Sequence, residues 1–200
     1  ETIAVGTITR LMPSKGNEHL VAAVPEMTRE HPRVRVLIVG EGELRSDLEA
    51  QARALALGDR LRVVGFRRDV AEVLTALDIV VFPSLWEGTP LTAFEALAAG
   101  KPIVATDADG LLDILTDRHD ALVVPKRNPA ALARGVGELI ARPDLAARLA
   151  GNAAAAGAMY DIAAFVRKME RLYELLHETS RATRRRSVLS ADLDFLTAKG

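Results

Sequence analysis

Residues 79–105, IVVFPSLWEGTPLTAFEALAAGKPIVA, contain a strand, a helix and a second strand in close succession. The apolar run at 79–82 is typical of a buried strand, and a helical pattern follows at 90–99. A second β-rich run at 102–105 closes the unit. Buried strands joined by a helical crossover are typical of a parallel sheet, whose connections are right-handed. The stretch therefore predicts a parallel sheet with helices packed on it.

The same alternation extends outward in both directions. Further strands are predicted at 3–8, 34–39, 61–64 and 121–124. Further helices are predicted at 18–30, 43–57, 70–77, 111–115 and 129–141. We therefore expect an α/β fold, namely a Rossmann-like parallel sheet of about six strands with helices on both faces.

Helical stretches without strands follow the predicted sheet, at 145–157, at 162–176 and, more weakly, near the C-terminus. The run from Arg181 to Arg186 predicts a charged break between the last two. We expect a binding domain at 1–178 and a tail or extra helix at 179–200. The cluster Arg181, Arg184, Arg185 and Arg186 fits either a solvated tail or a contact with anionic lipid or a partner.

Composition narrows the class of protein. A chain of 200 residues that is 49% hydrophobic can bury a substantial core. Its formal net charge of −1 argues against a nucleic-acid partner, since surfaces that follow phosphates usually carry a basic excess. Cysteine is absent, which excludes disulfides and thiolate metal sites. No signal peptide or run of about 20 apolar residues is found. We expect a soluble protein in the cytoplasm or at the inner face of the membrane.

The start of the predicted helix at 90–99 favours an anion. Thr89 is expected to act as the N-cap and Pro90 as the first helical residue. The amides of Leu91, Thr92 and Ala93 would then be unpaired donors at the positive end of the helix dipole. Such an end binds phosphate.

Two carboxylates flank this helix start. Glu87 lies in the loop before the helix, and Glu95 lies in its second turn. Both are placed to accept hydrogen bonds from hydroxyl groups, while the amides take the anion. The segment therefore fits a polyol that carries a phosphate.

Ligands of open α/β sheets bind beyond the carboxyl ends of the strands. Candidate groups follow the first five predicted strands: Arg10 and Lys15-Gly16, then Gly40-Glu41-Gly42, Gly65-Phe66, Glu87 to Glu95, and Asp107 to Gly110. Two cations in one cleft would balance a diphosphate, and glycines allow close backbone approach. Taken singly, the cations also fit solvated loop charges, and the Gly-Phe pair fits a turn with a core phenylalanine. The set together favours a binding site.

These motifs, in this order, resemble the C-terminal domain of GT-B glycosyltransferases of family 4. The resemblance is carried by Gly6 to Gly16, Val39 to Gly42, Gly65-Phe66 and Glu87 to Glu95, and it runs from about residue 2 to about residue 176. In that family, two glutamates separated by seven residues mark the nucleotide-sugar donor site. The chain would be the C-terminal half of such a fold.

The resemblance implies a donor site built from charged side chains and from backbone. Its donor-binding residues would be Gly6, Arg10, Lys15, Gly40, Gly42, Gly65, Phe66, Glu87, Gly88, Thr89, Pro90, Leu91, Thr92 and Glu95. Arg10 and Lys15 would bind the diphosphate, and with Glu87 they would be the catalytic residues. Glu87 would contact the donor sugar, and Glu95 the ribose. The Gly65-Phe66 region would contact the base.

The implied reaction is sugar transfer from a UDP- or GDP-sugar to an acceptor hydroxyl, with retention of configuration and without a metal ion or other cofactor. The acceptor site would lie on an N-terminal domain that this chain lacks, so we expect the chain to transfer little by itself. Because the chain begins with Glu1 and enters a strand at once, we expect it to be a piece of a longer protein. A non-catalytic nucleotide-sugar-binding module and a nucleotide-sugar epimerase remain alternatives.

Some residues depart from the family pattern. Asp109-Gly110-Leu111-Leu112-Asp113 stands where a Gly-Gly and a Pro-Glu pair are usual, and Asp120-Ala121 stands where a glycine is usual. We therefore expect an altered pocket edge. Asp107-Ala108-Asp109 also has the form of a metal-binding pair, but carboxylates beside a glycine favour a turn, and the histidines lack ligand spacing. No metal site is predicted.

Overall fold

The structure, a computed structural model, describes the backbone of residues 2–197 and the side chains of residues 2–180. It divides into two compact units, residues 1–159 and residues 160–200. The predicted contacts of Arg181, Arg184, Arg185 and Arg186 concern residues that lie outside those whose side chains are described. The boundary predicted after residue 178 lies inside the second unit.

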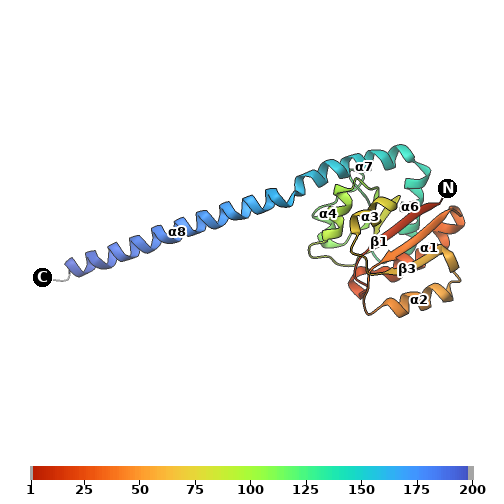
Figure 1. Cartoon of the computed structure of the whole chain (residues 1–200), viewed down its shortest axis with the longest axis horizontal. Coiled ribbons are helices and arrows are strands. Elements are labelled where there is room, and N and C mark those ends of the chain that lie inside the picture. Colours follow the sequence, from red (N-terminus) through yellow and green to blue (C-terminus); the bar gives the residue numbers. More distant parts are fainter. Residues whose placement is uncertain (1, 198–200) are drawn as a thin grey trace. The chain divides into compact units, whose positions relative to one another are not determined.

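The first unit contains a six-stranded, fully parallel sheet with the strand order β3-β2-β1-β4-β5-β6. Strands β1 and β3 of this sheet are labelled in Figure 1. Its strands are β1 (Ile3–Ile8), β2 (Val34–Val39), β3 (Leu61–Gly65), β4 (Ile79–Phe82), β5 (Ile103–Thr106) and β6 (Leu122–Val124). Every residue of β4 and β5 is buried, as expected for strands covered on both faces. The predicted Rossmann-like sheet of about six strands is confirmed.

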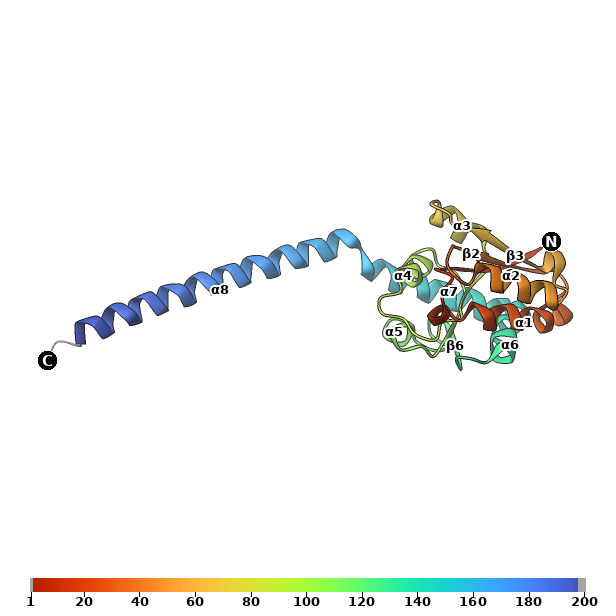
Figure 2. The ribbon, with the colours of Figure 1, turned by 90° about the horizontal axis from the view of Figure 1, so that it is seen from below.

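Two helical layers cover the sheet (Figures 1 and 2). One apolar cluster joins one face of the sheet to α1 (Asn17–Glu30), α2 (Arg45–Ala54) and α6 (Pro129–Ala141). A second cluster joins the other face to α3 (Val70–Ala76), α4 (Leu91–Ala98) and α5 (Asp109–Leu112). Helix α7 (Pro143–Gly157) contributes residues to both clusters. The short 3-10 turns are η1 (Pro13–Lys15), η2 (Gly58–Arg60) and η3 (Ala158–Tyr160).

The strand order turns back between β1 and β4. The chain moves outward from β1 to β2 and β3, then returns to the other side of β1 and moves outward again through β4, β5 and β6. The crossovers from β1 and from β4 therefore run on opposite faces, as the assignment of α1 and α4 to different clusters requires. Loops that part in this way leave a crevice at the carboxyl ends of the two strands.

The second unit consists almost entirely of α8 (Ile162–Thr197), whose backbone is helical without interruption. The break predicted at 181–186 is therefore wrong. Arginine is a good helix former, and the sequence from 162 to 197 contains neither proline nor glycine, so nothing in the backbone forces a break.

Helix α8 carries an exposed apolar stripe. Ile162, Phe165, Leu172 and Leu176 are all exposed, and their spacing of three, four or seven residues places them on one side of the helix. Residues 143–180 also form a helical stretch long and apolar enough to cross a membrane. That stretch includes α7, which buries Leu145 and other side chains in the core of the first unit, so the finding is weak support for a membrane span.

Leu132 tests the packing of α6 on the sheet. Its side chain is fully buried, so Leu132→Ala should lower the free energy of unfolding by about 2–5 kcal/mol through lost burial and a residual cavity. The matched control is Leu55→Ala, because the Leu55 side chain is 40% exposed. Urea denaturation measures both variants, and equal losses would contradict the proposed packing.

Candidate functional site

The loops that follow β1 and β4 meet through their backbones. The Ser14 carbonyl in η1 accepts hydrogen bonds from the amides of Leu85 (2.8 Å) and Trp86 (3.3 Å). Gly16 has φ +59°, and a Cβ atom there would lie 2.1 Å from the Pro83 carbonyl oxygen. Only glycine permits this approach. The two loops are therefore fixed to each other at the strand-order reversal.

This contact places Lys15 beside Glu87. The Lys15 Nζ lies 2.5 Å from Glu87 Oε2, and the Ser84 hydroxyl donates to Glu87 Oε1 over 2.7 Å. The Glu87 side chain is only 6% exposed and that of Lys15 is 19% exposed. Both carboxylate oxygens thus have a donor, which is how a buried charge is stabilised. The structure brings together two of the three predicted catalytic residues.

The start of α4 differs from the prediction. Thr89 makes no side-chain cap, and Pro90, with φ −79° and ψ 84°, precedes the helix instead of beginning it. The Leu91 amide donates to the Thr89 carbonyl over 3.0 Å, which makes an inverse γ-turn centred on Pro90. That turn is the physical reason that the helix begins one residue late.

The γ-turn reduces the number of free amides. The Leu91 amide is bound within the turn, and the Ala93 amide donates to the Pro90 carbonyl over 2.9 Å. Within the part of the chain that the structure describes, the Thr92 amide has no hydrogen-bond partner. The expectation of three unpaired amides is therefore wrong, and Thr92 alone offers a free one.

Arg10 and Glu95, from opposite sides of the strand-order reversal, have side chains that are not committed to protein partners. Arg10 is exposed, and the hydrogen bond found for its guanidinium among the described residues is one of 3.5 Å to the Met12 sulfur. The Glu95 carboxylate is exposed and forms no hydrogen bond or ion pair with any described residue. Partial burial raises the pKa of Glu95 above its ordinary value. Both groups remain available to a ligand.

The predicted glycines make close contacts with the chain itself. A Cβ atom at Gly40 would lie 1.8 Å from the Thr9 carbonyl oxygen, and one at Gly42 would lie 2.3 Å from that of Leu11. These two positions pack the loop after β2 against the loop after β1. Gly6 lies inside β1, where a Cβ atom would lie 2.6 Å from a methyl carbon of Leu77.

The Gly65-Phe66 pair lies at the carboxyl end of the edge strand β3. Gly65 has φ +90°, and its carbonyl accepts a hydrogen bond from the Gly40 amide over 2.8 Å. The Phe66 ring is 67% exposed, so it does not belong to the core. An aromatic ring on the surface at this end of the sheet can stack on a planar group.

Sequence reasoning missed the role of Ser84 and named Gly110 only as one of several candidates after the fifth strand. Ser84 holds Glu87, but a serine in a loop carries no pattern that reveals such a role. Gly110, at the start of α5, packs so closely that a Cβ atom there would lie 2.4 Å from the Glu87 carbonyl oxygen and 2.7 Å from that of Gly88. A glycine directly after Asp109 indicates a close backbone contact, but the spacing of residues could not reveal that the contact is with Glu87 and Gly88.

The Asp107-Ala108-Asp109 segment has a structural role. Asp107 Oδ1 accepts a hydrogen bond from the Lys126 amide over 2.8 Å, while the Asp109 side chain is 78% exposed. Among the described side chains, no group of three or more histidines and carboxylates is placed to hold a metal ion. Asp120, where a glycine was usual, is buried and accepts a hydrogen bond from the Thr116 amide.

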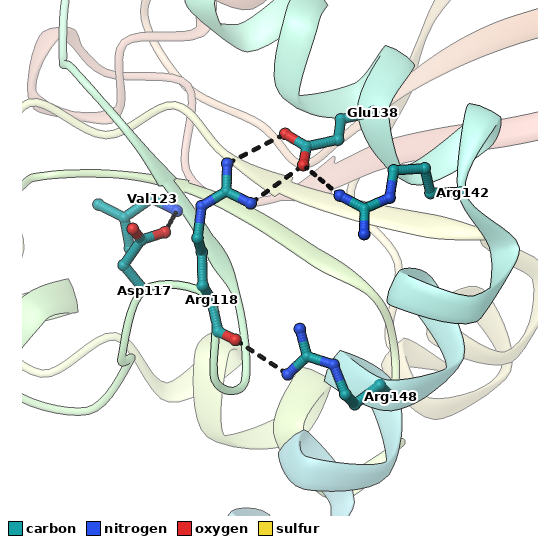
Figure 3. A network of polar contacts seen from close by, with 6 residues as sticks. All are labelled: Asp117, Arg118, Val123, Glu138, Arg142 and Arg148. Carbon is teal, nitrogen blue, oxygen red and sulfur yellow. Dashed lines mark hydrogen bonds and ion pairs between the residues drawn. The ribbon is translucent and has the colours of Figure 1, made fainter.

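Two pockets lie away from these residues. One, of about 210 Å³, lies between β6 and α6, and the other, of about 220 Å³, lies beside α2 and β3. The first borders the network in Figure 3, in which Arg118 and Arg142 both pair with Glu138 and Arg148 donates to the Arg118 carbonyl. Neither pocket is lined by a predicted donor-binding residue.

The fold and the paired loops define a Rossmann-like α/β domain whose candidate site lies at the reversal of strand order. The chain belongs to the family of glycosyl transferases group 1, whose model matches residues 1–156. Among curated relatives, alpha-D-kanosaminyltransferase from Streptomyces kanamyceticus is 31% identical over 149 residues, which is 74% of this chain and 39% of that protein. The chain thus spans well under half the length of this relative.

Solved structures agree with the fold. HepE from Anabaena, crystallised with UDP-glucose, superposes with a TM-score of 0.81 at 25% identity, over 87% of this chain and 49% of that chain. The C-terminal domain of a group 1 glycosyl transferase, LpcC from Francisella tularensis, superposes with a TM-score of 0.70 at 22% identity, over 79% of this chain and 85% of that domain. The latter likeness concerns the fold alone.

A double-mutant cycle tests the Lys15–Glu87 pair. Lys15→Met and Glu87→Gln should each lower the free energy of unfolding by about 1–3 kcal/mol, since each leaves a largely buried charge without the opposite charge that pairs with it. The double variant should lose less than the sum, with a coupling of about 1–3 kcal/mol. Denaturant unfolding measures all four proteins, and strict additivity would rule out the buried pair.

Glu95 predicts a pH dependence. Burial raises the pKa of Glu95 above the ordinary 4.5, so the neutral carboxyl group favours the folded state and its ionisation opposes folding. The stability that the neutral group contributes is therefore lost as the pH rises through the folded-state pKa. The Tm of Glu95→Gln should therefore gain on that of the wild type as the pH rises from about 4 to about 7. We expect a gain of at most about 2 °C, because solvent screens this exposed group. Calorimetry at several pH values checks it, and a Tm gap that narrows with rising pH would contradict it.

Proposed function

We propose that this chain is the C-terminal, donor-binding domain of a GT-B glycosyltransferase of family 4. The reaction is transfer of a sugar from a nucleoside diphosphate sugar to an acceptor hydroxyl, with retention of configuration. The observation that carries the proposal is the meeting of Lys15 and Glu87 at the strand-order reversal, 2.5 Å apart, with Arg10 and Glu95 free to bind a ligand. Membership of the glycosyl transferases group 1 family supports it.

The diphosphate is bound by cations from the loop after β1. Arg10 offers a planar set of donors, Lys15 a compact ammonium, and Thr92 a free amide at the start of α4. Negative charge grows on the diphosphate as the glycosidic bond breaks. Donors fixed in advance at that position stabilise the transition state more than the ground state.

The two glutamates bind hydroxyl groups. Glu87 accepts from the donor sugar and Glu95 from the ribose, while Phe66 stacks on the base. The remaining predicted residues, from Gly88 to Leu91 and at Gly40, Gly42 and Gly65, supply backbone around the ligand, and Gly6 supports it from within β1. HepE, which was crystallised with UDP-glucose, makes a UDP-sugar the preferred donor in this proposal, with a GDP-sugar as the alternative.

A second domain completes the enzyme. Three observations support it: the chain spans 39% of its kanosaminyltransferase relative, the LpcC domain of similar length is a C-terminal domain, and α8 exposes an apolar stripe. In this proposal an N-terminal domain covers the loops at the strand-order reversal and carries the acceptor site. We assign the binding domain to 1–178 and a tail or extra helix to 179–200, in a cytoplasmic protein. A solvated arginine cluster and one that contacts the inner face of the membrane are the two alternatives for that segment.

Calorimetric titration of the chain with UDP, GDP and ADP, without metal, tests the donor site. One nucleotide should bind, and Arg10→Ala and Glu95→Ala should each weaken it by about tenfold or more, because each removes a hydrogen bond that involves a charged group.

Arg33→Ala and Glu26→Ala are the matched controls. Arg33 is exposed and directly precedes β2, at the opposite end of the sheet, and Glu26 lies on α1 away from the loops. Both should leave binding unchanged. If no nucleotide bound, or if the controls weakened binding as much as the test variants, the donor site would be refuted. Nucleotide binding by a longer protein that transfers no sugar would instead favour a non-catalytic module.

A further inference from the structure

One buried hydroxyl group holds the Glu87 carboxylate, and a second holds the backbone of the residue that carries the first. The Ser84 hydroxyl donates to Glu87 Oε1 over 2.7 Å, and the Thr106 hydroxyl, at the end of β5, donates to the Ser84 carbonyl. Ser84 is 2% exposed and Thr106 is 1% exposed. Two hydrogen bonds therefore connect the buried strand β5 with the Glu87 carboxylate through Ser84.

We propose that Ser84 is the positioning residue for the Glu87 carboxylate. Through Glu87 it determines how much more tightly a nucleotide sugar binds than the nucleotide alone. The inference rests on the proposed function, because it takes Glu87 as the ligand of the donor sugar. Ser84 itself acts only through Glu87.

Lys15 cannot do this positioning by itself. Its ammonium sits on a flexible four-carbon stem, and a diphosphate competes with Glu87 for it. The Ser84 hydroxyl sits on one carbon, and its backbone is fixed by Thr106 and by the hydrogen bonds of Leu85 and Trp86 to Ser14. When Lys15 turns toward phosphate, Ser84 remains as the fixed donor to Glu87.

A fixed carboxylate binds a sugar hydroxyl more tightly than a mobile one, since no rotamer freedom is lost on binding. The Glu87 backbone is also held, because Gly110 packs against its carbonyl oxygen. Without Ser84, the carboxylate would lose the donor at Oε1 and turn about its terminal bonds. Binding of the sugar should weaken, and binding of the nucleotide alone should not.

The experiment compares nucleotides with nucleotide sugars by calorimetry on the whole chain. The probes are UDP, UDP-glucose, UDP-galactose, UDP-N-acetylglucosamine, GDP and GDP-mannose. The ratio of the Kd of a nucleotide to that of its sugar conjugate measures the contribution of the sugar to affinity. The conjugate with the largest ratio is used to compare the variants. In Ser84→Ala this ratio should fall by about tenfold, while the Kd of the nucleotide changes by less than about twofold.

Further variants make the test independent of a general loss of structure. Ser84→Cys, a weaker donor, should give an intermediate ratio. In a Glu87→Gln background, Ser84→Ala should reduce the ratio no further, since the two residues act as one unit. Thr106→Ser keeps its hydroxyl and should retain the ratio. Ser46→Ala, on the exposed surface of α2, should change neither Kd.

The outcomes separate the two proposals. If no nucleotide binds to the wild type, the proposed donor function fails. If a nucleotide binds but no conjugate binds more tightly, or if Ser84→Ala weakens nucleotide and conjugate equally, the donor function stands and the role of Ser84 is overturned. A loss confined to the conjugate, absent in the Glu87→Gln background, supports the inference.

Discussion

The reversal of strand order between β1 and β4 is the constraint on which the site depends. It sends the crossovers of these neighbouring strands to opposite faces of the sheet, so that the loops above them are free to form a crevice. The backbone contacts of Ser14 and Gly16 with residues 83–86 then close the distance between the loops. These contacts bring Lys15 Nζ to within 2.5 Å of Glu87 Oε2.

Burial fixes the geometry of the Lys15–Glu87 pair. A buried carboxylate with one missing donor is unfavourable, so the cation on one side and the hydroxyl on the other are both required. Arg10 and Glu95 differ from this pair, because they are exposed and lack strong protein partners. The site thus combines a fixed centre with a periphery that a ligand must organise.

The sequence was sufficient for the sheet but not for the finer geometry. Apolar runs place β1, β2 and β4 at the predicted residues because burial on both faces leaves a clear pattern. The start of α4 was misplaced because it depends on ψ of Pro90, which a proline does not fix. Lys15 and Glu87 could be proposed from motifs, whereas Ser84 and Gly110 act through contacts that only the folded chain reveals. The break at 181–186 was a charge argument applied to residues that favour helix.

The Asp117 carboxylate has a consequence for assembly. In Figure 3 it lies beside Val123, and it accepts a hydrogen bond from the Val123 amide over 2.8 Å. Strand β6 forms one rim of the sheet, where unpaired amides would otherwise invite an extended segment from another molecule. By occupying this donor with its own side chain, the protein protects that rim against strand addition and hence against edge-to-edge aggregation.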